Sequence, residues 1–196
     1  FKSQGLPLSW YVAPSSEPVH LGEILKAEGM VLYSSPVGMT IDLGRVRDDL
    51  PTPEELSISR VSDMRSSADF CSVLGAGFEF PSDVAESLMK LDAAHGFEEG
   101  NTRTDYVGYV EGKPVASTMM HLLPESAGIY CVATIPEMRK KGIATAMLLR
   151  ALQDAKAKGY KIAVLHAKLA GAGVYRRIGF LDRPWKVDWY AWAPGM

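Results

Sequence analysis

Apolar residues along the chain fall into two kinds of pattern that alternate with each other. Short β-rich runs are typical of strands, and longer runs in which apolar residues recur every three or four positions are typical of amphipathic helices. The pattern breaks near RVRDDLPTPEEL, Arg45 to Leu56, where charged residues and prolines replace the apolar positions. We therefore expect two parts, a small N-terminal β-α-β appendage over residues 1–50 and a larger domain over residues 56–196.

The N-terminal part predicts a strand, a helix and a second strand. The stretches LSWYVAP and VGMTIDL are β-rich, and EPVHLGEILKAEG between them has the apolar spacing of a helix that ends at Gly29. A unit of this size is too small for us to expect it to fold alone. Its last strand, Val37 to Leu43, could pair with a sheet edge of another copy, so a homodimer is a possible assembly.

The larger part predicts helices interleaved with strands. LSISRV is a strand candidate, and helices are expected over residues 62–75 and 81–96. The first of these helices begins with Ser62-x-x-Arg65 rather than with a true capping box. The following segment, TDYVGYVEGKPVASTMMHL, predicts a hairpin that turns at Glu111-Gly112-Lys113.

Two nearly all-apolar strands come next, AGIYCVATI and YKIAVLHA, with a helix between them. Strands of this kind are expected to be covered on both faces. The tail VDWYAWA alternates weakly and is expected to close the same sheet. The sequence thus predicts an α/β or α+β fold with a mixed central sheet flanked by helices.

Composition narrows the function classes. The chain has 196 residues, of which 47% are hydrophobic and 22% charged, and its net charge of −2 argues against a nucleic-acid binder. Its two cysteines, Cys71 and Cys131, imply neither a disulfide framework nor a zinc site, so we expect no metal and a reducing, cytoplasmic location. No apolar run is long enough to cross a membrane, and Phe1 starts no secretory signal, although further residues could precede it.

The stretch PEMRKKGIATAMLLRAL, Pro136 to Leu152, combines basic residues, a glycine and the start of an amphipathic helix. The first backbone N–H groups of such a helix have no partner inside it, and the helix dipole adds positive charge there. With Arg139, Lys140 and Lys141 around it, this helix start is expected to bind a phosphate. It matches neither G-x-x-x-x-G-K-[ST] nor G-x-G-x-x-G, which disfavours ATP and NAD.

The pattern R-x-x-G-x-A, Arg139 to Ala144, stands between a predicted strand and a predicted helix. This arrangement resembles motif A of the GCN5-related N-acetyltransferases, where the loop wraps the pyrophosphate of acetyl-coenzyme A (acetyl-CoA). Further on, LHAKLAGAGVYRRIGF, Leu165 to Phe180, resembles motif B of the same family. The resemblance extends from about Leu56 to the C-terminus. The N-terminal part resembles the tail of a degenerate half found in two-part members, and because it lacks R-x-x-G-x-A we expect one cofactor site per chain.

The resemblance implies a binding site for acetyl-CoA as co-substrate. In the family, the strand before the loop pairs its backbone with the pantetheine arm, and the loop binds the pyrophosphate. The matching strand positions are Val132, Ala133 and Thr134. The matching loop positions are Arg139, Lys140, Lys141, Gly142, Ile143, Ala144 and Thr145.

The resemblance also implies direct transfer of the acetyl group to an amine. Tyr175 matches the tyrosine that protonates the leaving CoA thiolate in the family, and a backbone N–H near Val132 would stabilise the oxyanion. Because no acyl-enzyme is needed, Cys131 is expected to be a packed small residue rather than a nucleophile.

The sequence departs from the family at two places. Lys168 stands where many members have an asparagine that holds the pantetheine, and Gly128 and Ala163 stand where different members carry the general base. No base is therefore assigned. The candidates nearby in the sequence, each of which could equally be an ordinary surface residue, are Glu125, His121 and His166.

The acceptor leaves the weakest trace in the sequence. Two segments match the acceptor side of the family, the loop from Gly75 to Ser82 and the hairpin around Glu111. Acidic residues could make this side favourable for a cationic amine or could simply form a solvated face: Glu79, Glu98 and Glu99. Three functions stay open: an acetyl-CoA-dependent N-acetyltransferase acting on a small amine or a peptide amine, a catalytically silent CoA-binding regulatory module, and an unrelated α/β protein that binds another phosphate. We expect the first.

Overall fold

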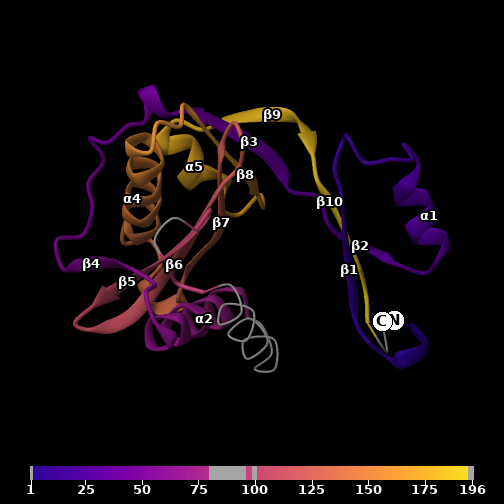
Figure 1. Cartoon of the computed structure of the whole chain (residues 1–196), viewed down its shortest axis with the longest axis horizontal. Helices are drawn as coiled ribbons and strands as arrows, with labels where there is room; N and C mark the ends of the chain where they lie inside the picture. Colours follow the sequence, from indigo (N-terminus) through magenta and orange to yellow (C-terminus); the bar gives the residue numbers. More distant parts are fainter. Residues whose placement is uncertain (1, 80–95, 99–100, 194–196) are drawn as a thin grey trace.

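The computed structural model describes residues 2–79, 96–98 and 101–193, which form a large lobe and a small lobe (Figure 1). The helix predicted over residues 81–96 lies, except for Gly96, outside the described residues. The other predicted strands and helices are present. The fold is the predicted mixture of helices with a central, mostly antiparallel sheet.

The large lobe is built on a seven-stranded sheet in the order β4-β5-β6-β7-β8-β3-β9. Neighbouring strands are antiparallel except β7 and β8, which are parallel. In chain order the strands of this sheet are β3 (Val37–Asp42), β4 (Leu56–Arg60), β5 (Arg103–Val110), β6 (Lys113–Leu122), β7 (Ala127–Thr134), β8 (Ile162–Ala167) and β9 (Leu181–Lys186).

Helices cover both faces of the large sheet. α4 (Ile143–Ala157) and α5 (Ala172–Ile178) lie over the main core, in which Tyr106, Met120 and Met147 are fully buried. α2 (Met64–Phe78) packs its apolar side against the opposite face (Figure 1). Short 3-10 turns occur at η1 (Lys2–Gln4), η2 (Leu43–Arg45) and η3 (Pro136–Met138). Over the described ranges, no helix combines the length and apolar character needed to cross a membrane.

The small lobe joins the two ends of the chain. Its sheet has the order β1-β10-β2, with β1 (Leu8–Val12), β2 (Val31–Ser34) and β10 (Asp188–Trp192), and α1 (Leu21–Ala27) packs on it. The tail was predicted to close the large sheet, and this was wrong, because β10 pairs with β1 and β2 instead. β2 was not predicted; it is short and mostly exposed, so it lacks the alternation that reveals a strand.

β3 belongs to the large sheet although it precedes the charged, proline-rich segment. It pairs with β8 on one side and β9 on the other, so it is not the free edge through which a second copy was expected to pair. The two sheets therefore divide the chain differently from the boundary at Arg45 to Leu56. The division into an appendage and a domain stays a prediction about domain organisation.

Two local details complete the comparison with the sequence. α2 begins with the capping box that was thought absent: the Asp63 carboxylate accepts from the Ser66 amide at 2.8 Å, and the Ser66 hydroxyl accepts from the Asp63 amide at 3.2 Å. The hairpin between β5 and β6 turns through Glu111 and Gly112 as predicted. Both have a left-handed φ, 50° and 72°, as a type I′ turn requires.

Candidate active site

The two parallel strands at the centre of the large sheet separate soon after they meet. β7 and β8 are paired only at Ala127 with Ala163 and at Gly128 with Val164, although β7 runs on to Thr134. Beyond Gly128, the edge of β7 that faces β8 therefore offers backbone N–H and C=O groups that have no ladder partner on β8. We refer to this region as the opening between β7 and β8.

A β-bulge lies on β7 at this opening. Tyr130 pairs with Met119 and Ala133 pairs with Ser117, so two residues of β7, Cys131 and Val132, oppose a single residue of β6. Cys131 has a left-handed φ of 52°. A bulge bends its strand and re-aims the backbone, and such features gather next to active sites. This bulge coincides with the positions predicted to receive the pantetheine arm.

The start of α4 lies just after the end of β7. Gly142, with a φ of 80°, caps the helix, and the first helical hydrogen bond runs from the Ala146 amide to the Gly142 carbonyl at 3.1 Å. Lys140 also has a left-handed φ, 65°. Among the described residues, no hydrogen bond uses the amides of residues 140–145. These donors and the dipole of a 15-residue helix converge on one loop, which is the arrangement that an anion site needs, while anion binding itself stays a prediction.

A half-open cavity of about 360 Å³ adjoins this helix start. Lys141, Gly142 and Thr145 line one side of it, and Arg177 from α5 adds a second cation. The other side is formed by residues 50–53, whose carbonyl oxygen at Pro51 would lie 3.5 Å from a Cβ added to Gly142. The sequence analysis missed Arg177 and this segment. The sequence signal that was available is the dipeptide Arg176-Arg177 at the end of motif B. In the structure Arg176 donates to the Asp182 carboxylate at 2.6 Å, whereas Arg177 lines the cavity.

Arg139 lies elsewhere than expected. Its guanidinium donates to the Thr134 carbonyl at 3.1 Å and to the Gly77 carbonyl at 2.9 Å, so it joins the end of β7 to the last turn of α2. It does not line the cavity at the start of α4. Ile143 is also turned away, with its side chain buried in the main core. The structure thus brings Lys141, Gly142 and Thr145 together, while a role of Arg139 in binding a cofactor stays a prediction.

Tyr175 projects from α5 into the main core. It packs edge-on against Phe180, with ring centroids 6.0 Å apart, and burial raises the pKa of its phenol to about 12. Its hydroxyl makes no hydrogen bond with any residue that the structure describes. Gly179 takes the predicted left-handed φ, 118°, at the end of the helix. Tyr175 is therefore a protonated donor that has no acceptor in the described part of the chain.

Several candidate bases share the sheet face opposite α4. Residues that pair across neighbouring strands point to the same face, so His121, which pairs with Gly128, lies on the same face as Val164 and, two residues on, His166. A Cβ at Gly128 would lie 2.5 Å from the Tyr130 ring, so the Tyr130 side chain occupies the space beside Gly128 on this face. Ala163 is fully buried on the other face.

The two histidines differ in their surroundings. His121 Nε2 lies 3.3 Å from the Thr102 hydroxyl. His166 meets Trp185 edge-on at 5.8 Å, and burial lowers its pKa, so its imidazole is neutral at physiological pH. The third candidate, Glu125, lies in the turn between β6 and β7. On the acceptor side, Glu79 and Glu98 are exposed, and Glu99 lies outside the described residues.

Comparisons with known proteins agree with this geometry. A family model described as "Acetyltransferase (GNAT) domain" matches residues 68–181. A GCN5-related N-acetyltransferase from Kribbella flavida has a similar structure, with a TM-score of 0.72 and 20% identity, over 100% of this chain and 72% of that one. One from Sphaerobacter thermophilus gives a TM-score of 0.70 and 16% identity, over 97% and 61%.

A predicted acetyltransferase from Clostridium acetobutylicum, whose structure was solved with acetyl-CoA, gives a TM-score of 0.55 and 20% identity over 66% of this chain and 92% of that one. No curated protein matches in sequence. At these identities the solved structures establish the fold. The family model spans more than half of the chain, including the bulged strand, the loop before α4 and Tyr175, and on this ground the chain belongs to the GCN5-related N-acetyltransferase (GNAT) family.

Proposed function

We propose that the protein is an acetyl-CoA-dependent N-acetyltransferase that moves the acetyl group directly to an amine of a small molecule or a peptide. As a GNAT protein it is an acetyltransferase. The amine acceptor is our proposal. The observation that carries it is the opening between β7 and β8, which borders the bulge at Cys131 and leads to the unpaired amides at the start of α4.

The residues at the opening fit acetyl-CoA. The amides of residues 142–145, with Lys141 and Arg177, would hold the pyrophosphate, and the cavity between them is of a size that small-molecule sites have. The unpaired edge of β7 would accept the pantetheine arm as an added strand, which is how an extended ligand commonly binds an open sheet edge. Acetyl-CoA supplies the activated thioester, and the chain orients it.

The transfer forms one bond and breaks one. A neutral amine attacks the thioester carbonyl while a backbone N–H beside the bulge stabilises the charge that develops on the carbonyl oxygen. The nitrogen–carbon bond forms, the carbon–sulfur bond breaks, and one proton from the nitrogen replaces the acetyl group on sulfur. Tyr175 faces the leaving sulfur in this proposal.

The high pKa of Tyr175 refines its role. Complete proton transfer from a phenol of pKa about 12 to a thiolate of pKa about 8.5 is uphill by roughly 5 kcal/mol. We therefore assign Tyr175 the role of a hydrogen-bond donor that stabilises the departing thiolate and keeps its own proton. The one proton that the amine releases balances the one that the thiolate takes up. A donor of this kind acts only when the negative charge appears, which is when catalysis needs it.

For the proton of the amine we propose His121. His121 pairs directly opposite Gly128, and Gly128 is the residue that matches the base position of histone-type members. His166 lies on the same sheet face and is the second candidate. Replacing each histidine by glutamine separates them, because the group that accepts the proton sets the acidic limb of the pH profile of kcat/KM.

The direct test of this function is release of free CoA thiol from acetyl-CoA in the presence of a panel of amines and peptides, beside a binding titration. Lys141→Ala should weaken acetyl-CoA binding by about fivefold, roughly the effect of losing one partly exposed charge near a phosphate. Lys158→Ala, at the other end of α4, is the matched control and should bind as the parent does.

The outcomes discriminate among the functions considered. Amine-dependent thiol release would support the transferase. Binding without release on any amine would favour a silent CoA-binding module. No preference for acetyl-CoA over simple nucleotides would contradict the proposed cofactor site.

A further inference from the structure

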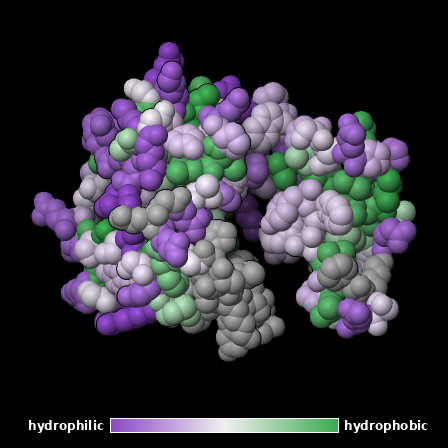
Figure 2. Space-filling view, in the orientation of Figure 1, coloured by the Kyte–Doolittle hydropathy of each residue, from purple (hydrophilic) through white to green (hydrophobic). Residues whose placement is uncertain are grey.

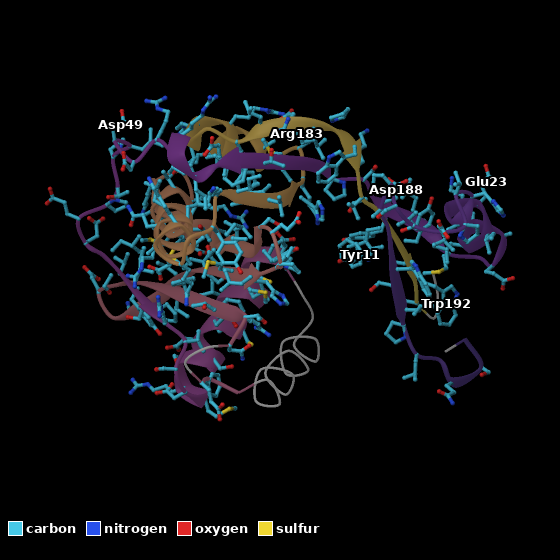
Figure 3. The ribbon with its side chains drawn as sticks, turned by 45° about the horizontal axis from the view of Figure 1, so that its top comes forward. Tyr11, Glu23, Asp49, Arg183, Asp188 and Trp192 are labelled. Carbon is cyan, nitrogen blue, oxygen red and sulfur yellow. The ribbon has the colours of Figure 1, made fainter. Side chains whose placement is uncertain are left out.

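The small sheet carries three aromatic side chains, one from each strand, of which the central one contacts both others. Tyr11 of β1 stacks on Trp189 of β10 with ring centroids 5.5 Å apart, and Tyr33 of β2 meets the same tryptophan edge-on at 4.7 Å. Tyr11 and Tyr33 remain 57% and 56% exposed. Figure 3 shows Tyr11 reaching from β1 toward the large lobe. These rings therefore face the space between the lobes rather than a core.

Lys168 places a cation against these rings. Its ammonium nitrogen lies 5.7 Å from the ring centroid of Tyr33, 5.7 Å from that of Trp189 and 6.0 Å from that of Phe78, the last residue of α2. All three distances fall within the range over which a cation is attracted to an aromatic face. We call Tyr33, Phe78 and Trp189 the aromatic box. The three rings come from three separate elements, β2, α2 and β10. The Lys168 ammonium occupies the place between them where a cationic ligand would bind.

The box lies at the mouth of the opening between β7 and β8. Lys168 directly follows β8 at the end that diverges from β7. On the β7 side, Phe78 follows Gly77, whose added Cβ would lie 2.7 Å from the Ala133 Cβ and whose carbonyl is held by Arg139. Figure 2 shows that the two lobes are separated by a gap. A ligand in the box would thus sit beside the place where the thioester is proposed to lie.

The surroundings of the box suit an exchangeable ligand. Lys168 is exposed as a whole, so its ammonium can leave the rings for water without a burial cost. Phe78 is 37% exposed. The Trp189 indole N–H and the Ser34 hydroxyl are buried without a hydrogen-bond partner within the described ranges. Buried polar groups are usually paired, so these two atoms, one in the box and one next to Tyr33, are exceptions to that rule.

We propose that the aromatic box binds the cationic group of the acceptor, which displaces the Lys168 ammonium. This proposal rests on the proposed acetyl transfer to an amine. The nitrogen that attacks the thioester must be neutral, whereas the nitrogen held by three aromatic faces is positively charged. The acceptor class that satisfies both needs is an aliphatic amine with a second basic or quaternary nitrogen, such as a diamine.

Lys168 then acts as an internal competitor. While its ammonium occupies the box, a cationic ligand must displace it, which lowers the apparent affinity. Lys168→Met keeps the length and apolar stem of the side chain and removes only the charge. The variant should therefore bind cations more tightly than the parent.

Binding is tested with two probes that carry no amine able to accept an acetyl group. Choline carries a quaternary ammonium, and 3,3-dimethylbutan-1-ol has the same shape without the charge. By titration calorimetry we expect choline to bind the parent more tightly than the alcohol does, and Lys168→Met to bind choline about three- to tenfold more tightly than the parent. Tyr33→Leu and Phe78→Leu should each weaken choline binding by about two- to fivefold, the equivalent of one cation–π contact.

Trp10→Leu is the matched control for these variants. Trp10 is an exposed aromatic of the same strand as Tyr11 and points to the other face, opposite Tyr190, so its loss should leave choline binding unchanged. Circular dichroism shows whether each variant retains its fold. Equal affinity for choline and the alcohol in both the parent and Lys168→Met would overturn the proposal, as would unchanged choline binding in both Tyr33→Leu and Phe78→Leu.

Acetyl transfer gives an independent readout of the acceptor class. The ratio of kcat/KM for 1,4-diaminobutane to that for butylamine should exceed ten and should fall in Tyr33→Leu. A ratio near one would contradict the proposed class even if transfer occurs. Absence of transfer to any amine would contradict the proposed function, while choline binding would still report on the box.

Discussion

Replacing Tyr175 by phenylalanine should separate activity from stability. The ring packs against the main core, and the hydroxyl makes no hydrogen bond with the residues that the structure describes, so its removal breaks no such bond. The residue is half-buried, and its hydroxyl is not among the fully buried polar atoms that lack a partner in the described part of the chain, so its removal relieves no large burial cost. The edge-on contact with Phe180 is kept, because it depends only on the ring. Tyr175→Phe should therefore be about as stable as the parent, with a melting temperature within about 2 °C of it.

The same variant should lose most of its activity. If the hydroxyl donates to the departing sulfur, its loss should lower kcat by about 10²-fold, which lies in the range for general acid–base groups. Acetyl-CoA affinity should change by less than about twofold, because the proposed bond strengthens only when charge appears on sulfur. In the parent, the pKa of about 12 keeps Tyr175 protonated, so this residue should produce no loss of kcat between pH 7 and about pH 11.

The assay combines thiol release, acetyl-CoA titration and thermal unfolding on the two proteins. A kcat within threefold of the parent would refute the role of the hydroxyl. A loss of stability greater than about 2 kcal/mol would refute the premise that the hydroxyl lacks a partner, since losing a satisfied hydrogen bond costs about that much.

Three further predictions concern the frame around the site. Asp154 accepts from Arg60 at 2.7 Å and from the buried Tyr106 hydroxyl at 2.8 Å, so Asp154→Ala should lower the free energy of unfolding by about 2–3 kcal/mol in denaturant titrations. Burial alone would raise the pKa of Asp154, but hydrogen bonds from these partners hold this pKa below its usual 3.8. The ionised carboxylate therefore stabilises the fold above about pH 4. The difference in unfolding free energy between the parent and Asp154→Ala should shrink as the pH falls below that value. Arg139→Ala should lower stability by about 1–2 kcal/mol and weaken acetyl-CoA binding by less than threefold, whereas a tenfold, salt-sensitive loss of affinity would show that Arg139 contacts the pyrophosphate. Gly142→Ala should weaken acetyl-CoA binding more than Gly159→Ala does. Gly159 is the matched control, because it has a similar left-handed φ of 87° at the other end of α4. Equal losses of affinity in the two variants would mean that backbone strain alone is responsible.

Most strands and helices of the large lobe could be predicted from local sequence patterns. The hairpin turn at Glu111-Gly112, the strand before the loop, and the helix from Ile143 each follow from residues adjacent in sequence, since turns and helix starts depend on their own side chains and dihedrals. The unpaired amides at the start of α4 were predictable for the same reason, because helix N-termini leave donors unpaired in any context. The loop therefore pointed to phosphate binding before the fold was known.

Features that depend on distant partners were missed. β10 pairs with β1 from the far end of the chain, and no local signal distinguishes this pairing from closure of the large sheet. Arg139 matches the family motif, yet its side chain binds the end of α2, a contact set by packing rather than by spacing. The aromatic box joins Tyr33, Phe78 and Trp189, which come together only when both lobes are formed.

A crystal structure of the protein with acetyl-CoA tests the central claim most directly. The account predicts that the pyrophosphate accepts hydrogen bonds from the amides at the start of α4, that the pantetheine arm lies in the opening between β7 and β8, and that the sulfur lies within hydrogen-bond distance of the Tyr175 hydroxyl. Acetyl-CoA bound away from the start of α4, or bound there with its sulfur out of reach of Tyr175, would contradict it.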